Sequence, residues 1–332
     1  MPDVEKERLR ENRILAKNLD LLYKYRPFDP AYPTQFERAL QMLRAGTIWM
    51  ATPSSFNDPF DCQPSIIRNK ETEQQDLAKI LENRLDVIKK ALRTHEQLAD
   101  RQLQPIARRK LVELRRLLES GLPKDRKYQV LKKYFIMPPD GDTAFNELKE
   151  RLDRVGVMSL SATPTQMLMW AHYASQHKGF CLGFERSEGS LLASQSQTKP
   201  VNYLDAYPNV DLSTLPVSWS FSLGDGGISD SLEIDIYEPC LQAVIYSKAT
   251  DWAYEQEWRV LVPRGASLTP YPSPLKKIIF GLRCEQNSRQ LIREAVSEAR
   301  AERPISFAEI ESKTGSFALR VRDLETVSST VA

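Results

Sequence analysis

Hydrophobic and polar positions near the start of the chain follow a strand pattern and then a helix pattern. The segment LLYKYR (21–26) is rich in Leu and Tyr and stops at Pro27, which predicts a β-strand. Between residues 36 and 43, apolar side chains recur at intervals of three and four, which predicts a helix that ends at Gly46. TIWMAT (47–52) predicts a second strand, so the order is strand, helix, strand.

The pattern changes between residues 70 and 154. Segments such as ILENRLDVIKKAL place apolar residues at helical spacing with charges between them, so we expect a helical insertion. Its ordinary interpretation is a solvated hairpin or an arm for oligomer or partner contact, and the alternative is a clamp on nucleic acid. Residues 1–20 are expected to form a charged helix, which leaves 21–69 and 155–325 as the core domain.

The second half of the chain contains further strands and two clear helices. One helix is expected to begin at Thr163, with Pro164 in its first turn, and to end at Gly179. The expected strands are GVMSLSAT (156–163), FCLGFE (180–185), EWRVLV (257–262), LKKIIFGL (275–282), ISFAEIES (305–312) and FALRVRDL (317–324), with a helix at 287–302 before the last two. Strands and helices mix without regular βαβ alternation, so we predict an α+β fold with a mixed or antiparallel sheet.

Composition narrows the class of protein. The chain has 332 residues and a formal net charge of +2, with 41% hydrophobic and 27% charged residues. This balance gives no strong overall attraction to nucleic acid or to a membrane surface. No apolar run approaches the roughly 20 residues that span a bilayer, and we expect no membrane contact. The four cysteines are far apart and form no zinc or disulfide pattern, so we expect a reduced, cytoplasmic protein.

Two of the three histidines lie in the expected helix that ends at Gly179. A spacing of five residues places His172 and His177 about 140° apart around a helix, so they do not share a metal ion. Trp170, Tyr173 and His177 instead fall on one face. This stripe is either an aromatic part of the core or one wall of a site, and His172 points elsewhere.

The loop SFNDPFD (55–61) carries two acidic residues. Asn57 and Asp58 before Pro59 suit a turn that caps its own backbone. The functional alternative is that Asp58 and Asp61 hold a cation or a ribose hydroxyl.

The segment YEQEWRV (254–260) groups three charged residues. On a strand, Glu255, Glu257 and Arg259 share one face while Trp258 and Val260 pack on the other. The ordinary interpretation is an exposed sheet face. The functional one is a carboxylate oriented by Arg259, with Lys248 just upstream as a second cation.

Several motifs together carry a resemblance to a known family. No dinucleotide-binding glycine motif, P-loop, nucleophile elbow or zinc pattern occurs in the chain. In chain order, the motifs are SFNDPFD, LSAT, MWAHYASQHKGFCLGF, VNY, YEQEWR and LKKIIFG. They resemble the bacterial domain of unknown function 2971 from Leu22 to about Leu282, and this resemblance implies no established activity.

The opening strand, helix and strand also resemble those of ADP-ribosyltransferase domains. That resemblance implies a His or Arg on the first strand, a Tyr or Ser on a middle strand and a Glu on a late strand. The late strand offers Glu255 and Glu257, and the middle strand offers Ser159 and Ser161. The first strand departs from the pattern, because it has no His; its candidates are Tyr23, Lys24 and Arg26.

The same resemblance implies NAD as the substrate that is cleaved. Glu257 would stabilise the positive charge that develops on the ribose and would hold a ribose hydroxyl. A first-strand cation would hold the pyrophosphate or ribose, and Tyr173 would stack on the nicotinamide. The catalytic candidates are Glu257, Glu255, Tyr173 and His177. The candidates for cofactor binding are Tyr23, Lys24, Arg26, Ser159, Ser161, Trp170 and Arg259. Further candidates are Asn57, Asp58, Asp61, His172 and Lys248, and no metal ligand set is assigned.

Three hypotheses follow for the function. The first is an ADP-ribosyltransferase-like enzyme, a toxin or phage-defence effector that modifies nucleic acid or protein. The second is a metal-dependent nuclease or phosphodiesterase that uses Asp58, Asp61, Glu257 and Lys248. The third is a non-enzymatic protein that binds a partner through its helical insertion, with the motifs serving only to stabilise the fold.

Overall fold

The computed structural model describes residues 19–67, 141–212, 218–224, 227–299 and 304–324, with short stretches between 109 and 127. Nearly all of the expected N-terminal helix and most of the expected helical insertion lie outside these residues. The chain divides into two compact units. Unit 1 takes in Met1–Cys62, Arg154–Ala206 and Ile245–Ala332, and unit 2 takes in Gln63–Asp153 and Tyr207–Val244.

The opening of unit 1 has the predicted order of strand, helix and strand. These elements are β1 (Leu21–Arg26), α2 (Pro33–Ala45) and β2 (Thr47–Met50). Gly46 ends α2 in the left-handed conformation, at φ 62°, and its N–H reaches the carbonyl oxygens of the last turn. The apolar face of α2 is buried in the core, as its three- and four-residue spacing predicted.

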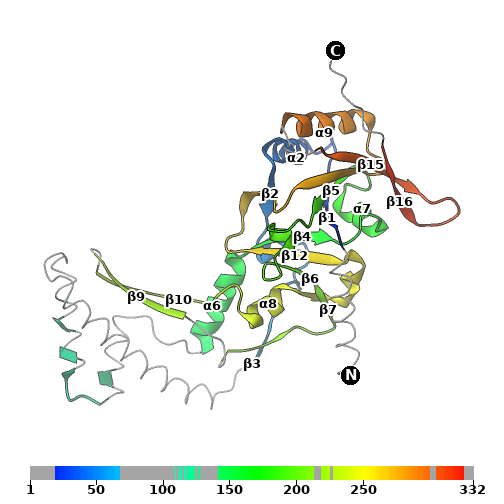
Figure 1. The fold of residues 1–332 in the computed structure, drawn as a ribbon. Helices are drawn as coiled ribbons and strands as arrows, with labels where there is room; N and C mark the ends of the chain where they lie inside the picture. Colours follow the sequence, from blue (N-terminus) through cyan, green and yellow to red (C-terminus); the bar gives the residue numbers. More distant parts are fainter. Residues whose placement is uncertain are drawn as a thin grey trace. The chain divides into compact units, whose positions relative to one another are not determined.

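The centre of unit 1 is a sheet of eight strands in the order β16-β15-β14-β5-β1-β4-β12-β6 (Figure 1). The bounds of the strands besides β1 are β4 (Gly156–Ser161), β5 (Phe180–Glu185), β6 (Thr198–Pro200), β12 (Glu257–Val262), β14 (Leu275–Phe280), β15 (Ser306–Ser312) and β16 (Leu319–Asp323). Neighbours are antiparallel except β14 and β15, which are parallel. The prediction of an α+β fold with a mixed sheet is therefore confirmed.

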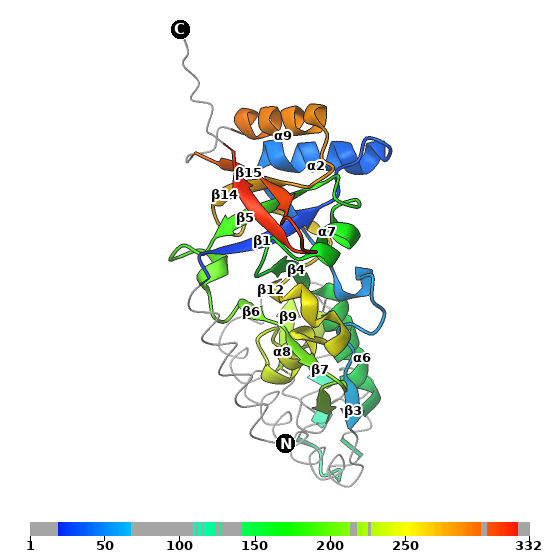
Figure 2. The same ribbon diagram turned by 90° about the vertical axis from the view of Figure 1, so that its right-hand side faces the viewer.

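Alternation of side chains gives this sheet two buried faces. Phe180 and Leu182 of β5 pack into the larger core cluster, which also takes the apolar faces of α2 and α9 (Gln286–Glu298). Cys181, between them, packs into a second cluster with Trp170 of α7 (Met167–Tyr173). Figures 1 and 2 show α2 and α9 side by side along the sheet.

Shorter elements complete both units. In unit 1, η1 (Pro53–Ser55), η2 (Leu191–Ala193) and η3 (Thr250–Glu255) are 3-10 helices, β2 pairs with β13 (Ser267–Pro270), and β7 (Asn202–Leu204) pairs in parallel with β11 (Ser247–Ala249). Unit 2 contains the parallel pair β3 (Ser65–Ile67) and β8 (Asn209–Asp211), the hairpin of β9 (Ser218–Gly224) and β10 (Gly227–Glu233), and the helices α6 (Gly141–Arg154) and α8 (Pro239–Ile245), whose last residues fall in unit 1.

The expected helix from Thr163 to Gly179 is shorter than predicted. It spans only Met167–Tyr173, because Ser175, Gln176 and His177 follow in the left-handed region, at φ 46°, 54° and 72°. The turn closes where the N–H of Gly179 donates to the carbonyl of Ala174 at 2.9 Å. His177 is therefore not on the helix, and the predicted helical stripe with Trp170 and Tyr173 is wrong.

Candidate functional site

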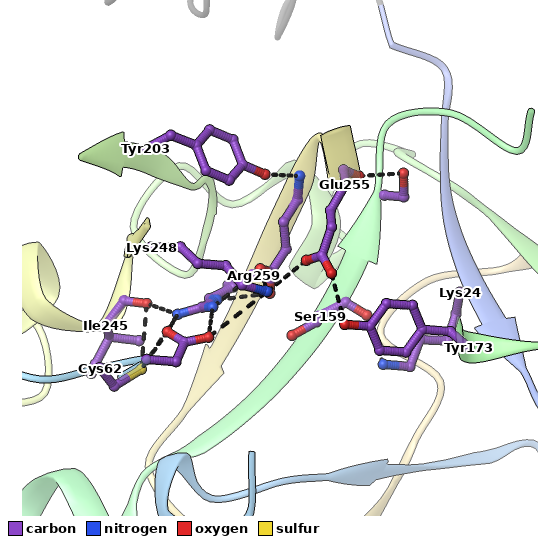
Figure 3. A network of polar contacts seen from close by, with 12 residues as sticks. Lys24, Cys62, Ser159, Tyr173, Tyr203, Ile245, Lys248, Glu255 and Arg259 are labelled. Atoms are coloured by element: carbon purple, nitrogen blue, oxygen red, sulfur yellow. Dashed lines mark hydrogen bonds and ion pairs between the residues drawn. The ribbon is translucent and has the colours of Figure 1, made fainter. Parts of the chain in front are cut away.

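Five buried charged residues of unit 1 form one connected group, called here the buried charge network. Its members are Asp61, Lys248, Glu255, Glu257 and Arg259. Figure 3 shows the contacts of this group, with Lys248, Glu255 and Arg259 labelled. Asp61 comes from the loop after η1, Lys248 from β11, Glu255 from the end of η3, and the other two from β12. Three acids thus meet two bases in a water-poor interior, where each charge depends on its partners.

Arg259 lies between two carboxylates and has no exposed surface (0%). Its Nε and Nη2 donate to the two oxygens of Glu257, at 2.8 and 3.1 Å. Its Nη1 and Nη2 donate to the two oxygens of Asp61, at 3.0 and 2.6 Å. Both pairs are bidentate, which fixes the orientation of the guanidinium as well as its charge.

Lys248 joins the two glutamates. Its Nζ lies 2.5 Å from Oε2 of Glu255 and 3.1 Å from Oε2 of Glu257. The other oxygen of Glu255 accepts a hydrogen bond from the Tyr173 hydroxyl at 2.7 Å. Tyr173 is half-buried, so the chain of contacts runs from Asp61 in the interior to a side chain that solvent reaches.

The backbone between the glutamates explains why both meet Lys248. Gln256 has φ 46° and turns the chain from η3 into β12, so Glu255 is not on the strand. The expectation of three charges on one exposed strand face is therefore wrong. Trp258 and Val260 do pack into the core on the opposite face of β12, as predicted.

The environment separates the pKa values of the two glutamates. Burial raises the pKa of Glu255 above its usual value, and Lys248 offsets only part of that rise. Burial acts in the same direction on Glu257, but Arg259 and Lys248 outweigh it and lower that pKa to about 2. Glu257 is thus a fixed negative charge, whereas Glu255 takes up a proton more readily.

This difference predicts how acid destabilises the protein. The pKa of Glu257 is below its unfolded value, so its contribution is present above about pH 4.5 and is lost as pH falls toward 2. The shift corresponds to about 3 kcal/mol. We expect Glu257→Gln to flatten the loss of unfolding free energy between pH 5 and 2.5, measured by urea denaturation. Glu298→Gln, at an exposed ion pair with Arg44, serves as the control and should keep the wild-type slope; equal slopes in all three proteins would contradict the assignment.

Three neighbouring strands bring predicted residues into one row. Tyr23 on β1 pairs with Ser161 on β4, and Ser161 pairs with Glu257 on β12. The Ser161 hydroxyl donates to the carbonyl of Glu255 at 2.7 Å, and the Ser159 hydroxyl donates to Glu257. The structure therefore brings the expected first, middle and late strands together at the network.

The two cations of β1 make their described hydrogen bonds to uncharged groups, and Glu257 and Glu255 also attract the Lys24 ammonium. Lys24 Nζ donates to the carbonyl of Ser159 at 2.8 Å, and burial, aided by Arg26, lowers its pKa to about 8. Arg26 donates to the Met42 sulfur at 3.3 Å, and burial lowers its pKa as well. Lys24 is thus placed beside β4 next to the network, whereas the Arg26 contact leads toward α2.

The loop SFNDPFD divides into turn residues and contact residues. Asp58 accepts a hydrogen bond from the N–H of Phe60 at 2.9 Å, which is the turn that the sequence predicted. Asn57 donates to the Tyr173 hydroxyl, and the Phe56 ring lies 5.3 Å from the Arg259 guanidinium. With Asp61, three residues of this loop therefore contact the network or its tyrosine.

The remaining aromatic and histidine candidates lie apart from the network. Trp170 is fully buried, packs edge-on against Tyr25 and donates to the carbonyl of Pro164 at 2.7 Å. The His177 ring stacks on Trp170 with the centroids 6.3 Å apart, and burial lowers its pKa. His172 is exposed. These contacts make Trp170 a core residue and give His177 a place at the edge of that core.

Sequence reasoning gave no role to Tyr203 and Ile245, which also contact the network. The Tyr203 hydroxyl accepts a hydrogen bond from the N–H of Glu257 at 2.7 Å. The carbonyl of Ile245 accepts from Arg259 Nη1 at 2.5 Å. Tyr203 belongs to the quoted motif VNY, which was a usable signal, whereas a backbone carbonyl leaves no trace in a sequence.

In the part of the chain that the structure describes, no three His, Cys, Asp or Glu side chains are arranged to hold a metal ion. The acids of the network are instead paired with Lys248 and Arg259. Residues 169–260 match the family described as protein of unknown function (DUF2971). This confirms the resemblance inferred from the motifs.

The DUF2971 match begins in α7 and ends in β12. It covers four members of the buried charge network, together with Tyr173 and Tyr203, but neither Asp61 nor the residues of β1. No curated protein and no solved structure matches the chain at a significant level. Among the described helices, none has both the length and the apolar character needed to cross a membrane.

Proposed function

We propose that unit 1 is an ADP-ribosyltransferase-like enzyme that cleaves NAD at the nicotinamide bond. The observation that carries the proposal is the row of Tyr23, Ser161 and Glu257 on three adjacent strands. It supports the expected layout of a first-strand, a middle-strand and a late-strand residue. The four cysteines are free, which suits a reducing compartment such as the cytoplasm.

The two glutamates have different roles in this proposal. Glu257, held ionised by Arg259 and Lys248, stabilises the positive charge that develops on the ribose as nicotinamide leaves. A ribose hydroxyl replaces the Ser159 hydroxyl as a donor to its carboxylate. Glu255, whose pKa is raised and whose carboxylate is oriented by Tyr173, takes the proton that the acceptor's nucleophilic group loses as it bonds to the ribose carbon that nicotinamide leaves.

The cation that the first strand must supply is Lys24 in this proposal. Its ammonium donates to a carbonyl on β4 and is attracted by Glu257 and Glu255, and a pyrophosphate oxygen adds a direct anionic acceptor. Tyr173 is the half-buried aromatic ring that stacks on nicotinamide. The acceptor of the ADP-ribose is nucleic acid or protein, as in a toxin or phage-defence effector.

One observation favours the alternative of a non-enzymatic protein that binds a partner. Each acid of the network is already paired with a cation of the same chain, which is what a purely structural network requires. NAD cleavage separates the two proposals, because a purely structural network has no reason to release nicotinamide.

The test is nicotinamide release from NAD labelled in the nicotinamide ring, with the purified full chain. Nucleic acid and a protein extract are supplied in separate arms as acceptors. We expect release by the wild-type protein and a loss of about 100-fold or more in kcat for Glu257→Gln, because a neutral amide does not stabilise the developing charge.

Glu311→Gln is the matched control, since Glu311 pairs with exposed arginines on β16, far along the sheet from β12. Thermal unfolding of both variants shows whether they remain folded. No release by the folded wild-type protein in any arm, or equal release by Glu257→Gln and wild type, overturns the proposal in favour of a partner-binding protein.

A further inference from the structure

The loop SFNDPFD contacts the network at both of its ends. Asp61 and Phe56 contact Arg259, and Asn57 contacts Tyr173. Arg259 in turn donates to Glu257 and Tyr173 donates to Glu255, the two glutamates that the proposed reaction uses. The loop therefore reaches both glutamates through their hydrogen-bond donors.

Asp61 is the anchor of the Arg259 guanidinium. It accepts hydrogen bonds from Nη1 and Nη2 of Arg259, at 3.0 and 2.6 Å, and Nη2 also donates to Glu257. With Glu257 and the carbonyl of Ile245, it gives every nitrogen of that guanidinium an acceptor. Because every nitrogen is hydrogen-bonded, the guanidinium cannot rotate. Its Nε and Nη2 donors therefore keep one orientation toward Glu257.

We propose that Asp61 is a positioning residue, which acts through Arg259 to orient the Glu257 carboxylate for the reaction. The inference rests on the proposed NAD cleavage. It replaces the two roles that the sequence suggested for Asp61, a ligand of a cation or of a ribose hydroxyl. Asp61 is buried with its carboxylate turned to Arg259, so a bound nucleotide does not need to contact it.

The physical effect is geometric. Without the carboxylate at residue 61, Arg259 keeps its charge and its hydrogen bonds to Glu257 but loses the two bonds to Asp61. The guanidinium and the Glu257 carboxylate can then adopt a wider range of orientations. A misplacement of about 1 Å in a catalytic group costs on the order of 100-fold in rate. Binding of NAD, which Asp61 does not contact, is expected to be unaffected.

The experiment is a double-mutant cycle on nicotinamide release. Asp61→Asn is expected to lower kcat by about tenfold to 100-fold with the KM for NAD unchanged. In the Glu257→Gln background, the same substitution is expected to change kcat by less than about twofold, because the group that it positions is already lost. Asp323→Asn, an exposed site at the edge strand β16, is the control for a lost carboxylate.

Asp61→Glu guards against a variant that fails to fold, because it retains the charge opposite Arg259. It is expected to keep more of the wild-type kcat than Asp61→Asn, with thermal unfolding recorded for each protein. A rise in KM with kcat unchanged, or losses that multiply in the double variant, overturns the positioning role. An inactive wild-type protein overturns the proposed function and this inference together, whereas an active one with an unaffected Asp61→Asn overturns the inference alone.

Discussion

Arg259→Leu is expected to lower the free energy of unfolding at pH 7 by about 3–5 kcal/mol. The substitution leaves Asp61 and Glu257 as buried carboxylates without the guanidinium that donates hydrogen bonds to both of them. Lys248 remains 3.1 Å from Glu257 and 3.9 Å from Asp61, so it compensates only in part. Chemical denaturation of the purified chain measures the loss.

The matched control for this result is Arg44→Leu, which breaks an exposed ion pair with Glu298 on α9. Such a pair is worth less than about 1 kcal/mol. The deficit of Arg259→Leu should also shrink at pH 4.5, because loss of the guanidinium lets the pKa of Glu257 rise and protonation then removes the buried charge. A loss no larger than that of Arg44→Leu would show that the network contributes little to stability.

Gly281→Ala is expected to cost about 3 kcal/mol of unfolding free energy. A Cβ atom at residue 281 would lie 2.2 Å from the carbonyl oxygen of His177 and 2.9 Å from that of Gly179. Both are backbone atoms of the left-handed turn after α7, so no flexible side chain can move aside. The turn itself must shift, and the stacking of His177 on Trp170 shifts with it.

The comparison for this substitution is Gly121→Ala, where a new Cβ meets no atom within 4 Å. Its unfolding free energy should stay within about 1 kcal/mol of the wild-type value. Tryptophan fluorescence gives a second measurement, since the environment of Trp170 changes only in Gly281→Ala. A Gly281→Ala protein as stable as Gly121→Ala would mean that the turn accommodates a methyl group.

Local pattern was enough to predict several strands of the central sheet, including β12 of the site. The segments LLYKYR, FCLGFE and EWRVLV are β1, β5 and β12 with the same bounds, because their composition and alternation suit one sheet. The end of α7 could not be predicted in this way. It depends on the close approach of Gly281 to His177, which joins segments about a hundred residues apart.

The burial of the charges was not predictable from local pattern either. An alternating strand shows which residues share a face, but not whether that face is covered. Glu257 and Arg259 are covered because Asp61 and Lys248 come from other parts of the chain and pack against them. Asp61 is separated from Arg259 by 198 residues in the sequence. Charge types in the sequence indicated the members of the network, whereas their pairing required the fold.

The division of the chain has a consequence for relatives of different length. The chain leaves unit 1 after Cys62 and returns at Arg154, and it leaves again after Ala206 and returns at Ile245. Every member of the buried charge network lies outside these two excursions, with Asp61 and Lys248 within a few residues of their boundaries. Homologous chains can therefore gain or lose many residues at either point and still assemble the same ionic contacts, so we expect length differences to concentrate there.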